Sequence, residues 1–131
     1  MPKKTLLLLI DDNPLLTGVY KAAFERAGFD IILAHNGKVG LALAKEKIPD
    51  GIVLDILMPG IDGFTVLQEL RADTTTKDIK TIVLTSIAKP EDLEKAKRLG
   101  ALECLVKSEL TLADIVARTS AYVSPGAPAG K

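Results

Sequence analysis

The sequence predicts an α/β fold, namely a doubly wound parallel sheet of five strands with helices on both faces. Short apolar runs alternate with segments of helical spacing along the chain, and this alternation corresponds to five βα units. Leu6–Ile10 is continuously apolar, as expected of a central parallel strand that is covered on both faces. The length of 131 residues is that of one domain.

The first half of the chain is expected to hold three strands and two helices. After the strand Leu6–Ile10, apolar residues such as Leu15 and Val19 recur at helical spacing from Pro14 until Gly28 stops them. The elements predicted next are a strand over residues 29–34, a helix over Gly37–Lys47, a strand over 50–55 and a loop over 58–63.

The second half repeats the same pattern. Apolar residues at helical spacing predict a third helix after the loop. Pro90 predicts the start of a fourth helix and Gly100 its end. Thr111 and Asp114 have the spacing of a capping box for a fifth helix. The remaining predicted strands cover residues 81–85 and 103–107.

The composition limits what the protein can do and where it works. With 17 basic and 17 acidic residues the formal net charge is zero, so nothing favours direct binding to nucleic acid or to a membrane surface. Cys104 is the single cysteine, which excludes an internal disulfide and favours a reducing compartment. No apolar stretch approaches the roughly 20 residues of a membrane span, and the apolar start has no signal-peptide cleavage site. We therefore expect a cytoplasmic protein.

A change in composition near the end of the chain sets the expected domain boundary. Residues 124–131 are rich in proline, glycine and alanine and are expected to form a disordered tail. The folded domain is then expected to span residues 1–123.

Four of the predicted strands end in residues that can handle a phosphoryl group. These residues are Asp11 and Asp12 after the first strand, Asp55 at the third, Thr85 at the fourth and Lys107 at the fifth. The C-terminal ends of parallel strands open on one edge of the sheet, so the side chains should converge. Two carboxylates about 4 Å apart repel by about 4 kcal/mol at an effective dielectric of about 20, and a hard cation such as Mg²⁺ relieves that repulsion. The set therefore suits a divalent cation and a transferable phosphate.

Each of these residues also has an ordinary structural explanation. An aspartate before a helix is often only its cap, which applies to Asp11 and Asp12, and Asp55 could simply begin a loop. Thr85 is a residue that strands favour, and Lys107 could extend to solvent. What these explanations leave unexplained is that such residues occur together at the ends of four strands.

Two further residues are expected to be structural. His35 is the only histidine and lies at the end of the second predicted strand, without a partner motif for a catalytic triad or a zinc site. We expect it to have a structural or surface role. Cys104 is expected to be a small buried hydrophobic residue.

With these residues in place, the chain resembles a response regulator receiver domain of bacterial two-component signalling, of the single-domain type. The resemblance covers roughly residues 5–122. The matching residues are the acidic pair Asp11 and Asp12, the phosphoacceptor Asp55 within the sequence LDILMPGIDG, the switch hydroxyl of Thr85 and the family's lysine, Lys107. The resemblance implies a flavodoxin-like sheet with strand order 2-1-3-4-5, which places Asp12 and Asp55 at the switch point between the first and third strands.

The resemblance also implies a function in phosphorelay signal transduction. A histidine kinase, a phosphotransfer protein or a small phosphodonor would pass a phosphoryl group to Asp55. Mg²⁺ would be held by Asp12, Asp55 and the backbone carbonyl of Leu57, with Asp11 acting through water. Such a domain is a phosphoprotein that assists its own phosphorylation and is not an enzyme with turnover.

Two other residues would act on the attached group. Lys107 would pair with one phosphoryl oxygen and Thr85 would donate a hydrogen bond to another. The movement of this hydroxyl would switch a partner-binding surface formed by the fourth helix, the fifth strand and the fifth helix.

Two positions depart from the family pattern. Cys104 stands where the family usually has tyrosine or phenylalanine, so the usual aromatic switch is not available. Ser108 stands where the family usually has a proline, often preceded by a cis bond. Because a cis bond before a residue other than proline costs about 2.5–4 kcal/mol, we expect the Lys107–Ser108 bond to be trans.

Other functions remain open from the sequence. A receiver-like adaptor that works without phosphorylation would keep the same fold, and Cys104 leaves room for it. A phosphohydrolase that uses Asp55 as its nucleophile commonly has a second aspartate two residues later, where this chain has Leu57. A flavin site is disfavoured because the first loop is acidic. No effector domain follows the fifth helix, so output is expected through a separate protein, unless the chain is a piece of a longer one.

Overall fold

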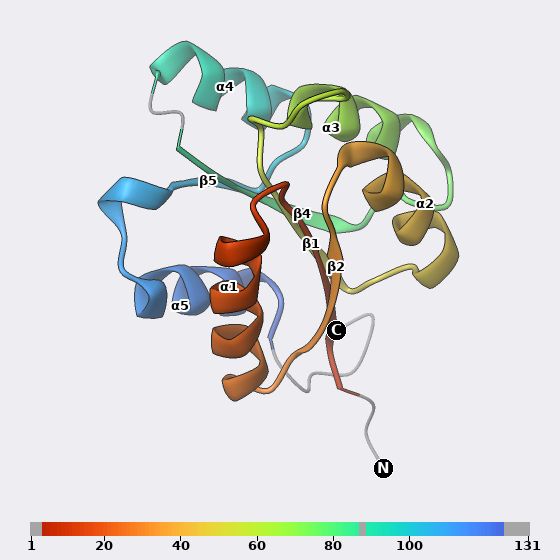
Figure 1. Cartoon of the computed structure of the whole chain (residues 1–131). Coiled ribbons are helices and arrows are strands. Elements are labelled where there is room, and N and C mark those ends of the chain that lie inside the picture. Colours follow the sequence, from red (N-terminus) through yellow and green to blue (C-terminus); the bar gives the residue numbers. More distant parts are fainter. Residues whose placement is uncertain (1–3, 87–88, 125–131) are drawn as a thin grey trace.

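The computed structural model describes residues 4–86 and 89–124, which fold into a parallel sheet between two layers of helices (Figure 1). The strands are β1 Leu6–Ile10, β2 Asp30–Ala34, β3 Gly51–Leu54, β4 Lys80–Thr85 and β5 Glu103–Val106. The helices are α1 Pro14–Arg26, α2 Gly37–Lys47, α3 Gly63–Ala72, α4 Pro90–Arg98, the short 3₁₀ turn η1 Lys107–Glu109 and α5 Leu112–Tyr122. The strand order β2-β1-β3-β4-β5 confirms the predicted flavodoxin-like arrangement.

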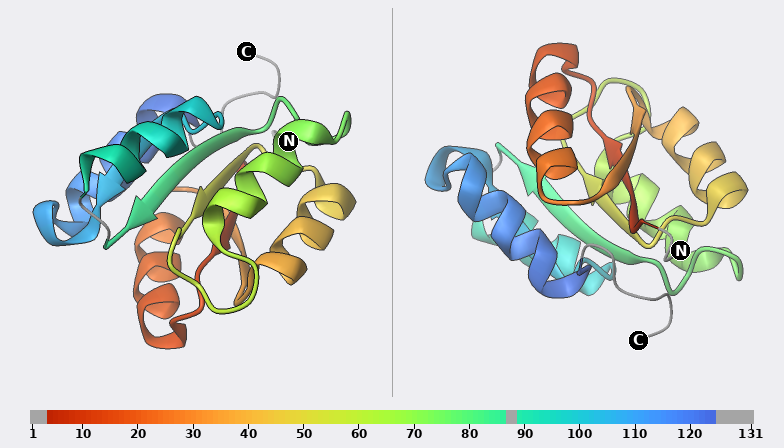
Figure 2. Two further views of the ribbon diagram at one scale, coloured as in Figure 1. Left: turned by 90° about the horizontal axis from the view of Figure 1, so that it is seen from above. Right: turned by 90° about the horizontal axis from the view of Figure 1, so that it is seen from below.

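Helices cover both faces of the sheet. Figures 1 and 2 show α1 and α5 on one face and α2, α3 and α4 on the other. Alternate residues of β1 point to opposite faces: Leu7 and Leu9 join the core under α1 and α5, whereas Leu8 and Ile10 join the core under the other three helices. Burial on both faces explains why this strand is apolar at every position.

The helix starts agree with the sequence signals, with one informative difference. The capping box of α5 forms as predicted between Thr111 and Asp114. Helix α1 begins at Pro14 as expected, but its cap is Asn13, whose side-chain oxygen accepts hydrogen bonds from the next turn. The interpretation of Asp11 and Asp12 as ordinary helix caps is therefore wrong.

The region around β5 differs from the sequence prediction in two ways. The strand ends at Val106, and Lys107 opens η1 with its side chain turned inward to the carboxylates described below. Cys104 is half-buried and its Sγ donates a hydrogen bond to the carbonyl of Leu93 at 3.5 Å. The described residues contain no cis peptide bond, so the Lys107–Ser108 bond is trans as expected.

The beginning and the end of the described domain meet beside the N-terminal end of β1. The Thr5 hydroxyl donates a hydrogen bond to the carbonyl of Ser124 at 2.9 Å. Most of the expected tail, residues 125–131, lies outside the described residues. None of the helices in the described ranges combines the length and the apolar character needed to cross a bilayer.

Candidate functional site

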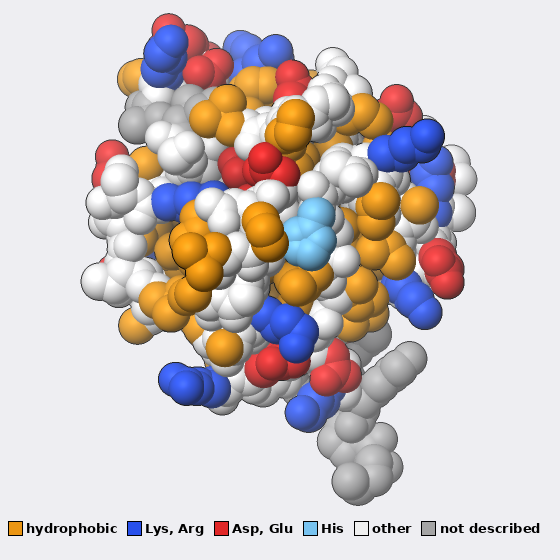
Figure 3. Space-filling model, viewed as in Figure 1, with side chains coloured by type: hydrophobic (Ala, Val, Ile, Leu, Met, Phe, Trp, Pro, Cys, Tyr) orange, Lys and Arg blue, Asp and Glu red, His pale blue; other side chains and the backbone are white. Residues whose placement is uncertain are grey.

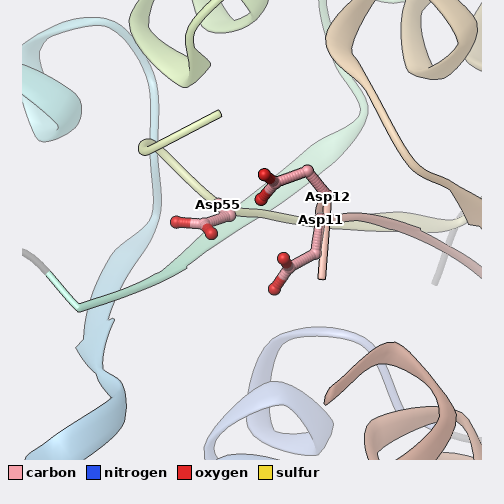
Figure 4. Close-up of side chains that lie close together, drawn as sticks. All are labelled: Asp11, Asp12 and Asp55. Carbon is pink, nitrogen blue, oxygen red and sulfur yellow. The ribbon is translucent and has the colours of Figure 1, made fainter. Parts of the chain in front are cut away.

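Three carboxylates converge at the C-terminal ends of β1 and β3 (Figure 4). One oxygen from each of Asp11, Asp12 and Asp55 lies within 4.8 Å of the others. Asp11 is 1% exposed and Asp55 is 5% exposed, whereas Asp12 is more open to solvent. The structure thus brings together the three aspartates that the sequence predicted to meet.

The alternation of the strands explains how these side chains reach one pocket. Leu9, Val53 and Leu105 lie on the sheet face beneath α1 and α5. Residues two positions further along the chain continue on the same face, and these are Asp11, Asp55 and Lys107. Backbone hydrogen bonds hold the strand ends in register, because the N–H groups of Asp11 and Asp55 donate to neighbouring strand carbonyls at 3.0 and 2.9 Å.

Lys107 reaches into this pocket and not out to solvent. Its Nζ lies 2.9 Å from Asp11 Oδ2 and 3.4 Å from Asp55 Oδ2, and its side chain is 14% exposed. Burial alone would lower the pKa of Lys107, but its hydrogen bond to Asp11 and the charge of Asp55 outweigh burial, so the pKa is raised. Lys107 is therefore charged at neutral pH, and the alternative explanation, that its side chain extends to solvent, is wrong.

The environment of Asp55 pulls its pKa in opposite directions. Burial raises the pKa of this carboxyl group, Lys107 opposes the rise and the charge of Asp11 adds to it. The backbone N–H of Leu57 also donates a hydrogen bond to Asp55 Oδ1 at 3.1 Å, which favours the charged form. The net result is a pKa above the usual value, as expected of a carboxylate that still has too little positive charge beside it.

The charge balance of the pocket suits a divalent cation. Three carboxyl groups and one ammonium group share a small volume, so the pocket holds more acidic than basic groups. Carboxylate oxygens are the protein ligands that Mg²⁺ prefers. The donor set therefore fits the magnesium ion that the sequence predicted, and the open side of the pocket at Asp12 leaves access to it.

The other predicted residues have different surroundings. Thr85 is fully buried at the end of β4, where it pairs in register with Val106, the residue before Lys107. His35 is exposed, with its Nε2 3.4 Å from the Thr17 hydroxyl, which agrees with a surface position. Leu57 has an exposed side chain on the loop that follows Asp55.

One surface feature was missed from the sequence. Leu15 is 78% exposed and Val19 is 47% exposed, although their helical spacing suggested a place in the core. Figure 3 shows apolar side chains gathered over α1, close to the acidic groups at the mouth of the pocket. The only signal in the sequence is that the apolar stripe of α1 is wider than one buried face requires.

Comparisons with known proteins agree with this geometry. The family model of the response regulator receiver domain matches residues 7–119. The chain is 38% identical over 103 residues to protein PilH of Pseudomonas aeruginosa, an alignment that covers 77% of this chain and 84% of PilH. It is 40% identical over 101 residues to the DNA-binding dual master transcriptional regulator RpaA of Synechocystis. That alignment covers 77% of this chain but only 42% of RpaA, so the chain spans less than half of that relative.

Solved structures show the same fold. The chemotaxis protein CheY4 of Vibrio cholerae superimposes with a TM-score of 0.85 at 24% identity, covering 92% of this chain and all of CheY4. The receiver domain of the Francisella response regulator 1452 superimposes with a TM-score of 0.82 at 26% identity, covering 90% of this chain and 95% of that domain. The match of the family model over most of the sequence, together with the fold and the acidic pocket, means that this chain belongs to the response regulator receiver family.

Proposed function

We propose that this receiver domain is a phosphoacceptor in which Asp55 takes a phosphoryl group from a phosphohistidine. The donor would be a histidine kinase or a phosphotransfer protein, and a small phosphodonor could replace it. The observation that supports this proposal best is the pocket itself, where a nearly buried carboxylate lies between two others and a paired lysine. A purely structural role does not account for so many buried charges in one place.

Asp12 and Asp55 would hold Mg²⁺, together with the backbone carbonyl of Leu57, while Asp11 would act through water. When bound, the ion would supply positive charge at the oxygens of the transferring group. Lys107 Nζ lies closer to Asp11, at 2.9 Å, than to Asp55, at 3.4 Å. This pairing supports an indirect role for Asp11 in holding the ion.

In the transfer step an oxygen of Asp55 attacks phosphorus. The new P–O bond forms as the P–N bond to the donor imidazole breaks, and the bonding electron pair leaves with the imidazole nitrogen. Lys107, held 3.4 Å from Asp55, would then pair with a phosphoryl oxygen as a point charge. Thr85, at the end of β4, would donate its hydroxyl to another oxygen and so change the surface formed by α4, β5 and α5.

The recessed position of Asp55 supports a protein donor that docks beside the pocket. A donor histidine must come within bonding distance of a carboxylate that is 5% exposed. The exposed apolar residues Leu15 and Val19 on α1 offer such a donor a contact surface at the mouth of the pocket. On this proposal the domain, residues 1–123, works in the cytoplasm and passes its signal to a separate output protein.

The test is phosphorylation by acetyl phosphate, measured as the gain in intact mass. We expect the full chain to gain one phosphoryl group in the presence of Mg²⁺ and none when the metal is chelated. Asp55→Asn should lose the gain, whereas Asp78→Asn, which removes an exposed carboxylate far along the sequence, should keep it. Full labelling of Asp55→Asn would contradict the proposal. No labelling of the wild type would favour the adaptor that works without phosphorylation.

A further inference from the structure

Tyr20 is a nearly buried tyrosine on the face of α1 that covers the sheet. Only 6% of the residue is exposed. It belongs to the core cluster that also contains Leu9, Val53 and Leu105, each of which lies two positions before a charged residue of the pocket. Long side chains of a helix lean toward its N-terminus, which for α1 is the end that follows Asp11 and Asp12. The phenol ring of Tyr20 therefore extends from the core toward the pocket.

The charges of the pocket act on this phenol. Burial raises the pKa of Tyr20, the positive charge of Lys107 lowers it, and the charges of Asp11 and Asp55 raise it further. The influence is mutual: burial lowers the pKa of Lys107, and Tyr20 is one of the groups that, with the two aspartates, raise it. Figure 4 shows Asp11 pointing away from Asp12, to the face of the sheet under α1 and α5, where Tyr20 also lies. The hydroxyl of Tyr20 is thus a neighbour of the charged groups on this side of the pocket.

Both Lys107 and Tyr20 have hydrogen-bonding capacity that is not used. An ammonium group has three N–H donors, and in the described part of the chain Lys107 Nζ bonds to two acceptors, one oxygen each of Asp11 and Asp55. The hydroxyl of Tyr20 has no hydrogen bond to a described residue. A buried tyrosine hydroxyl usually has a partner. Two polar groups that are too far apart for a direct bond can be joined by one water.

We propose that Tyr20 is a positioning residue of the phosphorylation site, whose hydroxyl oxygen accepts the third hydrogen bond of the Lys107 ammonium group through one bridging water. Lysine is a compact point charge on a flexible stem, so two partners on one side leave its position loosely defined. A third partner on the side of α1 holds the ammonium group beside Asp55, where a phosphoryl oxygen would arrive. This inference deepens the proposed function and rests on the role of Asp55. The alternative is that the ring only fills the core.

The first experiment measures whether Tyr20 and Lys107 interact, and it does not depend on phosphorylation. Tyr20→Phe removes the hydroxyl and keeps the ring, so the core stays filled. We expect it to lower the urea midpoint of the metal-free protein, and to leave the midpoint of Lys107→Met unchanged because the partner is already gone. If the ring only fills the core, Tyr20→Phe should be neutral or stabilising in both backgrounds, since it removes a polar group without a partner. That result, or an equal loss in both backgrounds, would overturn the inference.

The second experiment measures the effect on transfer. In the presence of Mg²⁺, Tyr20→Phe should slow labelling by acetyl phosphate about two- to tenfold, which is the usual weight of one hydrogen bond. Tyr122→Phe is the matched control, because it removes the same hydroxyl from the other tyrosine of the chain. The Tyr122 hydroxyl donates at 2.7 Å to Glu103, which lies at the opposite end of β5 from Lys107. The control should therefore be labelled at the wild-type rate.

The outcomes separate this inference from the proposed function. If Tyr20→Phe and Tyr122→Phe are both labelled at the wild-type rate, the hydroxyl does not position Lys107 for transfer and the inference is wrong. If the wild type takes up no phosphoryl group, the proposed role of Asp55 is contradicted, while the urea midpoints still decide whether Tyr20 and Lys107 interact.

Discussion

Lys107 determines the charge balance of the pocket. Its ammonium group lies between two nearly buried carboxylates, 2.9 Å from Asp11 and 3.4 Å from Asp55. Removing one partner of a buried ion pair leaves an uncompensated charge, which typically costs about 3–5 kcal/mol. Lys107 should therefore stabilise the fold and not only the phosphorylated state.

We predict that Lys107→Met lowers the free energy of unfolding in the absence of metal. Mg²⁺ should then restore more stability to this variant than it adds to the wild type, because the cation replaces the lost positive charge. The affinity for Mg²⁺ should therefore rise, while phosphorylation should be impaired. Urea denaturation with and without Mg²⁺ measures the first effect, and Lys38→Met on the exposed face of α2 is the control. A strong fall in Mg²⁺ affinity would contradict this role.

Asp12 is the carboxylate most open to solvent in the pocket. We expect Asp12 and Asp55 to contribute most to the affinity for Mg²⁺. We predict that Asp12→Ala loses most of its Mg²⁺ affinity in calorimetric titration. Asp11→Ala should lose less, because Asp11 is already engaged by Lys107. Near-normal binding by Asp12→Ala would show that the ion, if it binds, is held elsewhere.

At the scale of the elements, the glycines Gly40 in α2 and Gly18 in α1 differ in how closely their surroundings pack. A Cβ at Gly40 would lie 2.5 Å from Ile10 Cδ1, so α2 packs closely on the residue that precedes Asp11. Gly18 in α1 has nothing within 4 Å of the same position. The same substitution should therefore have opposite effects at the two sites.

We predict that Gly40→Ala destabilises the protein by about 1–3 kcal/mol, because overpacking displaces Ile10. Gly18→Ala should stabilise it by about 0.5–1 kcal/mol, because alanine loses less backbone entropy than glycine in a helix. Thermal or urea unfolding of both variants measures the difference. Equal effects at the two positions would mean that α2 and β1 are not packed as the structure describes.

The elements themselves could largely be predicted from sequence, for local reasons. Pro14 and Pro90 mark helix starts, and Gly28 and Gly100 follow helix ends with positive φ angles of 104° and 109°. The end of β5 could not be predicted in this way. The side chain of Lys107 contacts carboxylates 52 and 96 residues earlier in the chain, and a local pattern carries no information about such distant contacts.

At the scale of the whole molecule, the parallel topology does most to explain the site. Once the strands are parallel, residues at their C-terminal ends must share one edge, so Asp11, Asp12 and Asp55 could be predicted to meet. The sequence could not predict which of these aspartates pairs with Lys107, because the pairing depends on how far the side chains reach across the sheet. The sequence also could not predict that Leu15 is exposed, because the spacing of apolar residues does not distinguish a buried core from an interaction surface.

The central claim is that Asp55 accepts the phosphoryl group, and chemical mapping of the modified residue tests it most directly. The full chain is incubated with acetyl phosphate and Mg²⁺, the acyl phosphate is reduced with borohydride, and the reduced residue is located by tandem mass spectrometry. We predict reduction at Asp55 alone, and only when Mg²⁺ is present. Reduction at Asp11 or Asp12, or labelling that persists without the metal, would contradict the claim.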